Sequence, residues 1–484
     1  MRKIIGTSVA IALSLSACGS GGGGGGGTVI LPTPTPTPTA GCSLREQQDF
    51  ALATLREWYL FPETLPASPN PAAFTTVQDY IDSLTATARS QGRDRFFTYI
   101  TSIAEETAFF SGGASAGFGV RLAYDTTARR VFIAEAFEGA PALTAGIDRG
   151  DEIVAIGATP TTLRTVNDIF ASEGTSGITN ALGPTTAGTV RTLQLTGQGG
   201  ARTLTVTKGT FSLSPISSRY GARILNVSGR QIGYLNMRTF ISSADQQLRD
   251  SFLSFRNAGV TEFIVDLRYN GGGLVSTANL FGDLLGRNRL TSEIFSQERF
   301  RPEKASNDEI HRFAPTAQSV APVKIAFIGT GSTASASELV INGMIPYLGS
   351  NMALVGANTF GKPVGQIAID RTACDARIRV VAFGTTNAAN NLNYFNGLAS
   401  SVANTCRAAD DVTLPLGDVR EASVAQAVSF LSTGSATCTA ISGAGGQGTA
   451  SRAPNAVSDG VALHLEMLMP DQPNVAQREV PGLF

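Results

Sequence analysis

The sequence predicts a mixed α/β protein with three successive regions, and three observations lead to this prediction. Residues 42–105 carry helical patterns, residues 106–208 change to short strands separated by turns, and residues 209–442 alternate strands with helices. Such alternation is typical of an α/β core. A chain of 484 residues with 42% hydrophobic residues is long and apolar enough for two or three domains with buried cores.

A targeting signal precedes these regions. Arg2 and Lys3 give it a charged start, and residues 4–15 are apolar. This apolar run is too short for a membrane helix, which needs about 20 residues. It ends in Leu-Ser-Ala-Cys, which resembles a bacterial lipobox and implies that residues 1–17 are a signal peptide removed before a lipid-bearing Cys18. An ordinary signal peptide with a chance cysteine is the alternative.

The residues after Cys18 indicate a tether. Ser20, rather than Asp, is the second residue after the cysteine, and by resemblance to known lipoprotein sorting this favours the outer membrane. Residues 18–41 then contain a run of glycines and a Pro-Thr repeat, which give a flexible coil and a stiffer extended spacer. We therefore expect a lipid-anchored protein of the cell envelope whose soluble body faces the periplasm.

Composition argues against two classes of partner. Lys and Arg number 37 and Asp and Glu 38, so there is no electrostatic reason to expect nucleic acid. The two histidines, His311 and His464, are far apart, and no Cys or His cluster has the spacing of metal ligands. We therefore expect neither a metal nor a cofactor.

Four cysteines remain after Cys18. An even number in an exported chain predicts two disulfides, and three pairings are possible. The residues themselves do not choose between the pairings of Cys42, Cys374, Cys406 and Cys438.

The region 42–105 is predicted to be a small helical region. Ser43 and Glu46 form a capping-box pattern, which predicts a helix that ends near Tyr59, before two prolines. A second helical pattern covers about residues 74–89.

The region 106–208 resembles a bacterial PDZ domain. Residues 117–122 lead into one strand and residues 131–134 form another. A short helix at 139–143, a Gly-Asp-Glu turn and an apolar strand that ends at Ile156 follow. This resemblance implies a mostly-β domain inserted before the α/β core.

The first strand of this region carries a predicted peptide-binding site. The loop at Gly117, Phe118 and Gly119 would present backbone N–H groups to a peptide's terminal carboxylate. The strand that begins at Val120 would then pair with the peptide. A small β domain that only packs against its neighbours is the alternative.

The region 209–442 is predicted to be the α/β core, and residues 443–484 are assigned only as a C-terminal tail with a Gly-rich start. In the core, strands are expected at residues 232–236, 262–268 and 324–328, and helices at residues 244–255 and about 336–345.

Ser335 is a candidate nucleophile. Because a strand ends near Ile328 and a helix begins near Ala336, the Ser335 hydroxyl lies at a helix N-terminus. Free N–H groups and the helix dipole favour negative charge there, so the Ala336 N–H is a candidate donor to the oxyanion formed when serine attacks a carbonyl. Ser335 and Glu338 also fit a capping box, which is the structural alternative.

Lys362 is the candidate base, because a serine nucleophile needs one and neither histidine lies in a recognisable motif. Burial would have to lower the pKa of this lysine towards neutrality. In an extended segment Lys362 and Gln366 share one face, so the glutamine can hydrogen-bond and orient the amine. A surface lysine in a glycine turn is the alternative.

Residues 265–273 form the third segment of interest, in which a strand runs into three glycines. Glycines let backbone approach a substrate closely and can turn N–H groups inward. Gly272, or a neighbour, could thus supply a second oxyanion donor. Dinucleotide-binding and P-loop glycine spacings are not present.

Together these segments resemble the carboxyl-terminal processing, or tail-specific, serine peptidases. That family has Leu-Arg-x-Asn-x-Gly-Gly, then Ser-Ala-Ser-Glu, then Thr-Phe-Gly-Lys with a Gln four residues after the Lys, all downstream of a PDZ-like region. All occur here in that order, and the resemblance covers roughly residues 45–385. It implies Ser335 as nucleophile, Lys362 as general base, Gln366 as orienting partner and a crotonase-like ββα core.

Two prolines depart from the family pattern. Pro363 replaces the usual Gly after the lysine, and Pro346 stands near where many members carry an Asp. The function implied is a serine endopeptidase that cuts near the C-termini of envelope proteins, which it would hold by those termini. The alternative is an inactive crotonase-like or PDZ protein that binds peptides or hydrophobic ligands.

Overall fold

A computed structural model describes residues 41–442 and 465–484 of the chain. The predicted signal peptide, Cys18 and all but the last residue of the 18–41 tether lie outside the described residues, as does the Gly-rich part of the tail. No helix within the described part has the length and apolarity needed to cross a membrane.

A six-stranded sheet forms the centre of the fold, and its strands follow the order β10-β11-β12-β15-β16-β19. Within this sheet β11, β12, β15, β16 and β19 run parallel to their neighbours, and β10 pairs with β11 as an antiparallel hairpin. The strands and their helices are β10 (Arg223–Val227), β11 (Arg230–Asn236), α7 (Ala244–Asn257), β12 (Glu262–Asp266), α8 (Val275–Leu285), β15 (Lys324–Gly329), α9 (Ala336–Leu348), β16 (Met352–Gly356), β19 (Thr405–Arg407) and α10 (Ala422–Thr433).

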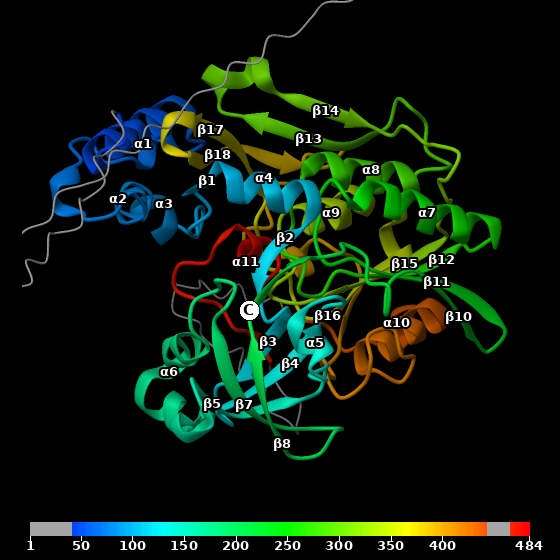
Figure 1. Ribbon diagram of the computed structural model, residues 1–484. Coiled ribbons are helices and arrows are strands. Elements are labelled where there is room, and N and C mark those ends of the chain that lie inside the picture. Colours follow the sequence, from blue (N-terminus) through cyan, green and yellow to red (C-terminus); the bar gives the residue numbers. More distant parts are fainter. Residues whose placement is uncertain (1–40, 443–464) are drawn as a thin grey trace, which may run out of the picture. The chain divides into compact units, whose positions relative to one another are not determined.

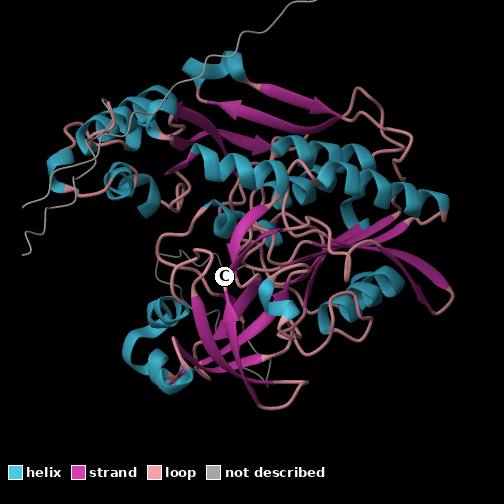
Figure 2. Cartoon of the chain, viewed as in Figure 1, coloured by secondary structure: helices cyan, strands magenta, loops and turns pink. Residues whose placement is uncertain are grey.

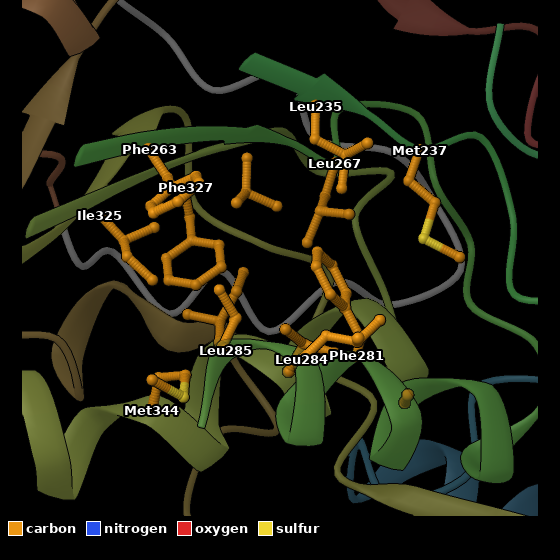
Figure 3. Close-up of a cluster of buried hydrophobic side chains, with 14 of the residues drawn as sticks. Leu235, Met237, Phe263, Leu267, Phe281, Leu284, Leu285, Ile325, Phe327 and Met344 are labelled. Atoms are coloured by element: carbon orange, nitrogen blue, oxygen red, sulfur yellow. The ribbon is translucent and has the colours of Figure 1, made fainter. Parts of the chain in front are cut away.

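The two faces of this sheet bury different residues, as strand alternation requires. Phe263 and Phe327 point to one face and pack with α7, α8 and α9. Figure 3 shows both phenylalanines beside labelled side chains of α8 and α9. Ile264 and Ile328 point to the other face and pack with α10. The core is therefore a three-layer α/β/α arrangement with helices on both sides of the sheet (Figure 2). The predicted strands and helices of this region are confirmed within a few residues at each end.

A five-stranded sheet connects the N-terminal helices to the core. In it β1, β18, β13 and β14 follow one another, and β17 pairs with β18. Its strands are β1 (Tyr99–Ser102), β13 (Ile294–Phe300), β14 (Glu309–Arg312), β17 (Val364–Arg371) and β18 (Ala376–Thr386). The helices that pack on β17 and β18 are α1 (Leu44–Trp58), α2 (Val77–Leu84) and α3 (Ala86–Ser90).

The single helix predicted over residues 74–89 is wrong in one respect. It is divided into α2 and α3 at Thr85, whose backbone leaves the helical conformation (φ −93°, ψ 2°). The Thr85 hydroxyl donates to the carbonyl of Ile81 at 3.1 Å, which favours a break at this point.

The residues between 103 and 212 supply six strands of a seven-stranded sheet and both strands of a separate two-stranded sheet (Figure 1). The larger sheet has the order β20-β3-β4-β5-β7-β8, with β6 paired to β5. The elements of this part are α4 (Ile103–Gly112), β2 (Ala114–Gly117), β3 (Val120–Asp125), β4 (Arg130–Ala136), α5 (Pro141–Thr144), β5 (Glu152–Gly157), β6 (Arg164–Thr165), α6 (Val166–Leu182), β7 (Val190–Thr196), β8 (Arg202–Thr207) and β9 (Gly209–Ser212).

The C-terminal residues take part in this same sheet. β20 (Glu466–Met467) pairs with β3, and α11 (Val475–Glu479) follows it along the chain. A further bridge joins Leu483 to Arg121 of β3. Pairings this short leave no alternating pattern in the sequence, so the position of these residues on β3 is not predictable from sequence.

Two disulfides are present among the described residues, which confirms the prediction of two. Cys42 pairs with Cys374 and thereby ties the start of α1 to the β17–β18 hairpin. Cys406 pairs with Cys438 and ties β19 to the segment after α10.

Candidate active site

The three segments singled out in the sequence meet at one edge of the six-stranded sheet. They are the loops that follow β12, β15 and β16, which are parallel neighbours, so their carboxyl ends lie together. The Ala334 N–H donates to the carbonyl of Asn270 at 3.0 Å, which joins the first two loops. The Phe360 N–H donates to the carbonyl of Thr333 at 2.9 Å, which joins the second loop to the third.

Ser335 stands at the start of α9 in a conformation unusual for a serine. Its φ is 55° and its ψ is −116°, and its side chain is half-buried. Backbone conformations of this kind cost free energy and are found where function requires a fixed side-chain direction. Gly272 lies against it, and a Cβ there would approach the Ser335 Cβ to 2.8 Å. The glycine loop, residues 270–273 after β12, therefore lies in direct contact with the serine.

Glu338 connects the serine to the lysine. One carboxylate oxygen accepts from the Ser335 N–H at 3.1 Å and the Lys362 N–H at 2.7 Å. The other accepts from the Thr359 hydroxyl at 2.6 Å and the Gly361 N–H at 2.7 Å. The carboxyl is fully buried, and burial raises its pKa despite these four donors. Glu338 therefore fixes the backbone positions of Ser335 and Lys362 relative to each other.

The side chain of Lys362 is oriented by Gln366. The Lys362 amine donates to Gln366 Oε1 at 2.8 Å, and the Gln366 amide in turn donates to the carbonyl of Phe97. Loss of hydration lowers the pKa of the Lys362 amine, and the carboxylate of Glu479 opposes that shift. An amine with a lowered pKa is more readily neutral, which is the state a general base requires.

The glycine loop is fixed by Asn270. Its side chain donates to the carbonyl of Met237 at 2.9 Å and accepts from the Gly272 N–H at 3.0 Å. Its carbonyl accepts from the hydroxyl of Ser337 at 3.1 Å. The Gly272 N–H is thus engaged within the loop, and its proposed role as an oxyanion donor stays a prediction. Ala336 is the first residue of α9, so its N–H has no acceptor in its own helix.

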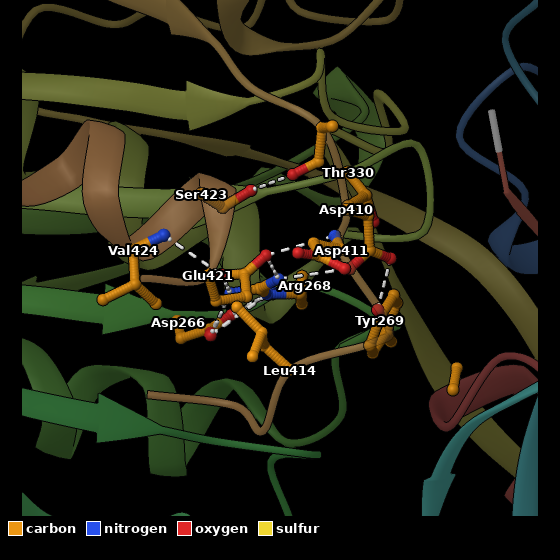
Figure 4. Close-up of polar contacts among 12 residues, drawn as sticks. Asp266, Arg268, Tyr269, Thr330, Asp410, Asp411, Leu414, Glu421, Ser423 and Val424 are labelled. Atoms are coloured by element: carbon orange, nitrogen blue, oxygen red, sulfur yellow. Dashed lines mark hydrogen bonds and ion pairs between the residues drawn. The ribbon is translucent and has the colours of Figure 1, made fainter. Parts of the chain in front are cut away.

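Arg268 anchors the start of the same loop in a buried ionic network, shown in Figure 4. Its guanidinium donates to Asp266 at 2.9 Å, to Glu421 at 2.8 Å and to Asp410 at 3.1 Å. The hydroxyl of Tyr269 donates to Asp410 as well. The arginine therefore holds the strand end from which the glycines emerge.

The predicted peptide-binding residues lie where β2 of the two-stranded sheet leads into β3 of the seven-stranded sheet: Gly117 ends β2 and Val120 begins β3. Gly119 and Val120 direct their N–H groups to the backbone oxygen of Phe484, at 2.9 and 3.2 Å. A Cβ on Gly117 would meet the same residue at 2.6 Å. Phe118 is buried in the apolar cluster beneath.

Sequence reasoning missed two contributions to the site. The sequence predicts only a helix cap for Glu338, and the signals that mark this residue are its positions in Ser-x-x-Glu and in the Ser-Ala-Ser-Glu segment. The approach of Glu479 to Lys362 had no signal, because the tail carries no motif. Among the described residues no group of His, Cys, Asp or Glu is arranged to hold a metal ion.

Comparison with known proteins finds similarity over two segments of the chain. Residues 231–387 match the domain described as peptidase family S41, and residues 46–99 match the peptidase S41 N-terminal domain. A chloroplastic C-terminal processing peptidase of Tetradesmus obliquus is 29% identical over 269 residues, which cover 54% of each chain. The carboxy-terminal processing protease CtpA of Bacillus subtilis is 26% identical over 281 residues, 57% of this chain and 53% of that protein.

A solved structure from Bacteroides fragilis, described as an S41 protease, shares the fold. Its TM-score is 0.61 at 22% identity, and the match covers 79% of this chain and 97% of that one. Two segments of the chain therefore match domains of peptidase family S41, and the chain is a homologue of the carboxyl-terminal processing proteases. It spans about half the length of the curated relatives it matches.

Proposed function

We propose that this protein is a serine endopeptidase of the tail-specific type, with Ser335 as nucleophile and Lys362 as general base. The observation that carries the proposal is the bonding through Glu338, which holds the backbone of both residues, together with the Lys362–Gln366 hydrogen bond. A surface lysine in a turn would need neither. We further propose that the fold is a crotonase-like core with a PDZ-like insertion.

The reaction begins with a neutral Lys362. Its amine accepts the proton of the Ser335 hydroxyl while the serine oxygen bonds to the carbonyl carbon of the substrate. The resulting oxyanion is stabilised at the N-terminus of α9, where the Ala336 N–H and the helix dipole favour negative charge. Gly272, or its neighbour Gly273, supplies a second donor once the substrate is bound.

The intermediate then collapses in two stages. The C–N bond breaks, and the lysine returns the proton to the leaving amine, so that the serine carries an acyl group. A water molecule attacks this ester, again giving its proton to Lys362, and the released serine recovers that proton. Gln366 holds the amine in a fixed direction, because Gln366 accepts the amine's hydrogen bond and donates its own amide N–H to the carbonyl of Phe97.

The substrates we propose are envelope proteins held by their C-termini on the sheet edge at Gly117–Val120. The N–H groups of Gly119 and Val120 point outward from this edge, which suits capture of a terminal carboxylate. The lipobox at Cys18 supports a lipid anchor in the outer membrane. Substituting Cys18→Ser should give a soluble or unprocessed species, and a soluble wild-type protein would refute the anchor.

A serine-reactive phosphonate tests the nucleophile directly. We expect label on Ser335 by peptide mapping, and we expect Lys362→Ala to abolish both labelling and cleavage of a denatured protein. Ser337→Ala is the matched control, because this buried serine lies two residues away and donates only to a carbonyl. Label on Ser337, or undiminished cleavage by Lys362→Ala, would contradict the assignment.

Capture of the C-terminus is tested with paired substrates. A protein with an apolar free C-terminus should be cut faster than the same protein amidated at its C-terminus, whereas short peptides should differ little. Gly119→Val should abolish this preference, since a Cβ there would approach Ala140 Cβ to 2.0 Å. Equal rates for the free and amidated proteins would show that the edge does not read the carboxylate.

A further inference from the structure

The peptide-binding edge of β3 is occupied by the chain's own last residues. The Phe484 N–H donates to the carbonyl of Val120 at 2.9 Å, and its backbone oxygen accepts from Gly119 and Val120. Two residues along, the Leu122 N–H donates to the carbonyl of Gly482 at 2.8 Å. This alternation is the antiparallel main-chain pairing by which an extended peptide adds to a sheet edge. Figure 1 marks the C-terminal end at this place.

The side chain of Phe484 fills the apolar end of the same groove. It is 3% exposed and belongs to the cluster that contains Phe118, Ile178 and Leu182. Backbone capture together with a pocket for one side chain is how such an edge distinguishes peptides. The groove therefore accommodates a large apolar side chain at the position of Phe484.

Arg478 and Glu479, which precede the residues paired with β3, lie over the glycine loop after β12. The Gly271 N–H donates to the carbonyl of Glu479 at 3.0 Å, and a Cβ on Gly271 would meet the carbonyl oxygen of Arg478 at 2.3 Å. The absence of a side chain at Gly271 thus lets another backbone segment approach closely, and here that segment is Arg478 and Glu479. The Arg478 guanidinium also donates to the carbonyl of Phe96 at 3.0 Å, next to the Phe97 that holds Gln366.

One side chain of β3 contacts both places. Arg121, which is 1% exposed, donates to the carbonyl of Pro481 at 2.9 Å and to the carbonyl of Tyr269 in the glycine-loop segment. The carboxylate of Glu479 meanwhile favours the charged form of Lys362, which is the wrong state for a base. The same arginine therefore binds both the C-terminal residues on the β3 edge and the segment that carries the glycines.

We propose that residues 478–484 are a resident ligand that occupies the peptide-binding edge of β3 and covers the glycine loop after β12 until an extended peptide with a large apolar side chain at the position of Phe484 replaces them. This rests on the proposed function, because the edge must be the site where substrate tails bind. A tethered ligand competes at a high effective concentration, so an added peptide binds the intact chain weakly.

Gly482→Val tests the proposal by loosening the tail. Gly482 has φ +84°, and a Cβ there would meet the carbonyl oxygen of Leu122 at 2.7 Å. Gly229→Val is the matched control, because Gly229 has φ +79° and no atom within 4 Å of its Cβ position. Both variants carry similar backbone strain, but only one disturbs the tail.

Binding is measured by fluorescence anisotropy in full-length chains that also carry Ser335→Ala, with a labelled peptide of the sequence of residues 475–484. Gly482→Val should bind this peptide at least about tenfold more tightly than its parent, while Gly229→Val should match the parent. Because no cleavage is required, an inactive peptidase would not change this result. With Ser335 restored, Gly482→Val should also cleave a denatured protein several-fold faster.

Equal affinity in all three chains, or no binding in any of them, would overturn the proposal. Thermal unfolding identifies a Gly482→Val chain that does not fold. Phe484→Ala then takes its place, because it removes the anchoring side chain without strain in the backbone, and the same tighter binding is expected. A folded Phe484→Ala chain with the affinity of its parent would overturn the proposal equally.

Discussion

Two helices of this protein begin with the same pattern, Ser-x-x-Glu, and the two starts differ in almost every physical respect. At α1, Ser43 has φ −60° and ψ 156°, the extended conformation usual for an N-cap, and Glu46 accepts from its N–H at 3.0 Å on an exposed surface. At α9, Ser335 has φ 55°, and Glu338 is fully buried.

The difference teaches how a local motif becomes a functional one. Glu46 accepts hydrogen bonds from its own cap, whereas Glu338 also binds the loop that carries Lys362. Burial strengthens every such bond and makes a missing partner expensive. The first pattern caps the start of a helix. The second also holds two loops in the geometry that the proposed chemistry needs.

The largest expected effect separates the two serines. Ser335→Ala should lower kcat/KM for a denatured protein by at least about 1,000-fold, because the attacking oxygen is gone. Ser43→Ala should leave kcat/KM unchanged and lower the free energy of unfolding by about 1 kcal/mol, the usual cost of a lost N-cap. Cleavage assays and denaturant unfolding of both variants measure the contrast. Similar kcat/KM values in the two variants would remove the functional distinction between the helix starts.

The second-largest expected effect is a difference between the two glutamates in how much their substitution lowers stability and cleavage rate. All four partners of Glu338 are donors, so an amide in its place turns an N–H group towards other N–H or O–H groups. We expect Glu338→Gln to lower the free energy of unfolding by about 2–4 kcal/mol and the cleavage rate by about 100-fold.

Glu46→Gln is the control for that substitution. It occupies the same position in its box but is solvent-exposed, so water replaces whatever bond is lost. Little change in stability and none in cleavage is expected. Comparable losses in the two variants would show that burial does not set the two boxes apart.

Much of the fold was predictable because its signals are local. The strands and helices of the α/β core carry long apolar runs and clear boundaries, and Ser335, Lys362 and Gln366 lie in motifs with fixed spacing. The order of these motifs also indicated that they belong to one site.

The parts that escaped prediction depend on contacts between distant segments. The Ser-x-x-Glu pattern itself does not distinguish Glu338 from Glu46, because the burial of each glutamate is decided by what packs around its helix. The tail forms only a two-residue strand and one bridge, so its place on β3 leaves no pattern. The pairing of Cys42 with Cys374, across most of the chain, likewise follows from tertiary structure alone.

The smallest expected effect is a pH dependence that belongs to α9 and not to α1. Loss of hydration lowers the pKa of Lys362, and only its neutral amine can accept the serine proton. Below that pKa the neutral fraction, and with it kcat/KM, should fall about tenfold for each pH unit of acidification. Above it kcat/KM should stay level into mild alkali. Glu46→Gln should give a profile superimposable on that of the wild type, since its box does not contact the lysine. Initial rates on a short peptide, over a pH range in which the protein stays folded, measure both profiles. If chemistry limits the rate and kcat/KM is the same from acid to alkaline pH, Lys362 is not the base, and the burial around α9 serves stability alone.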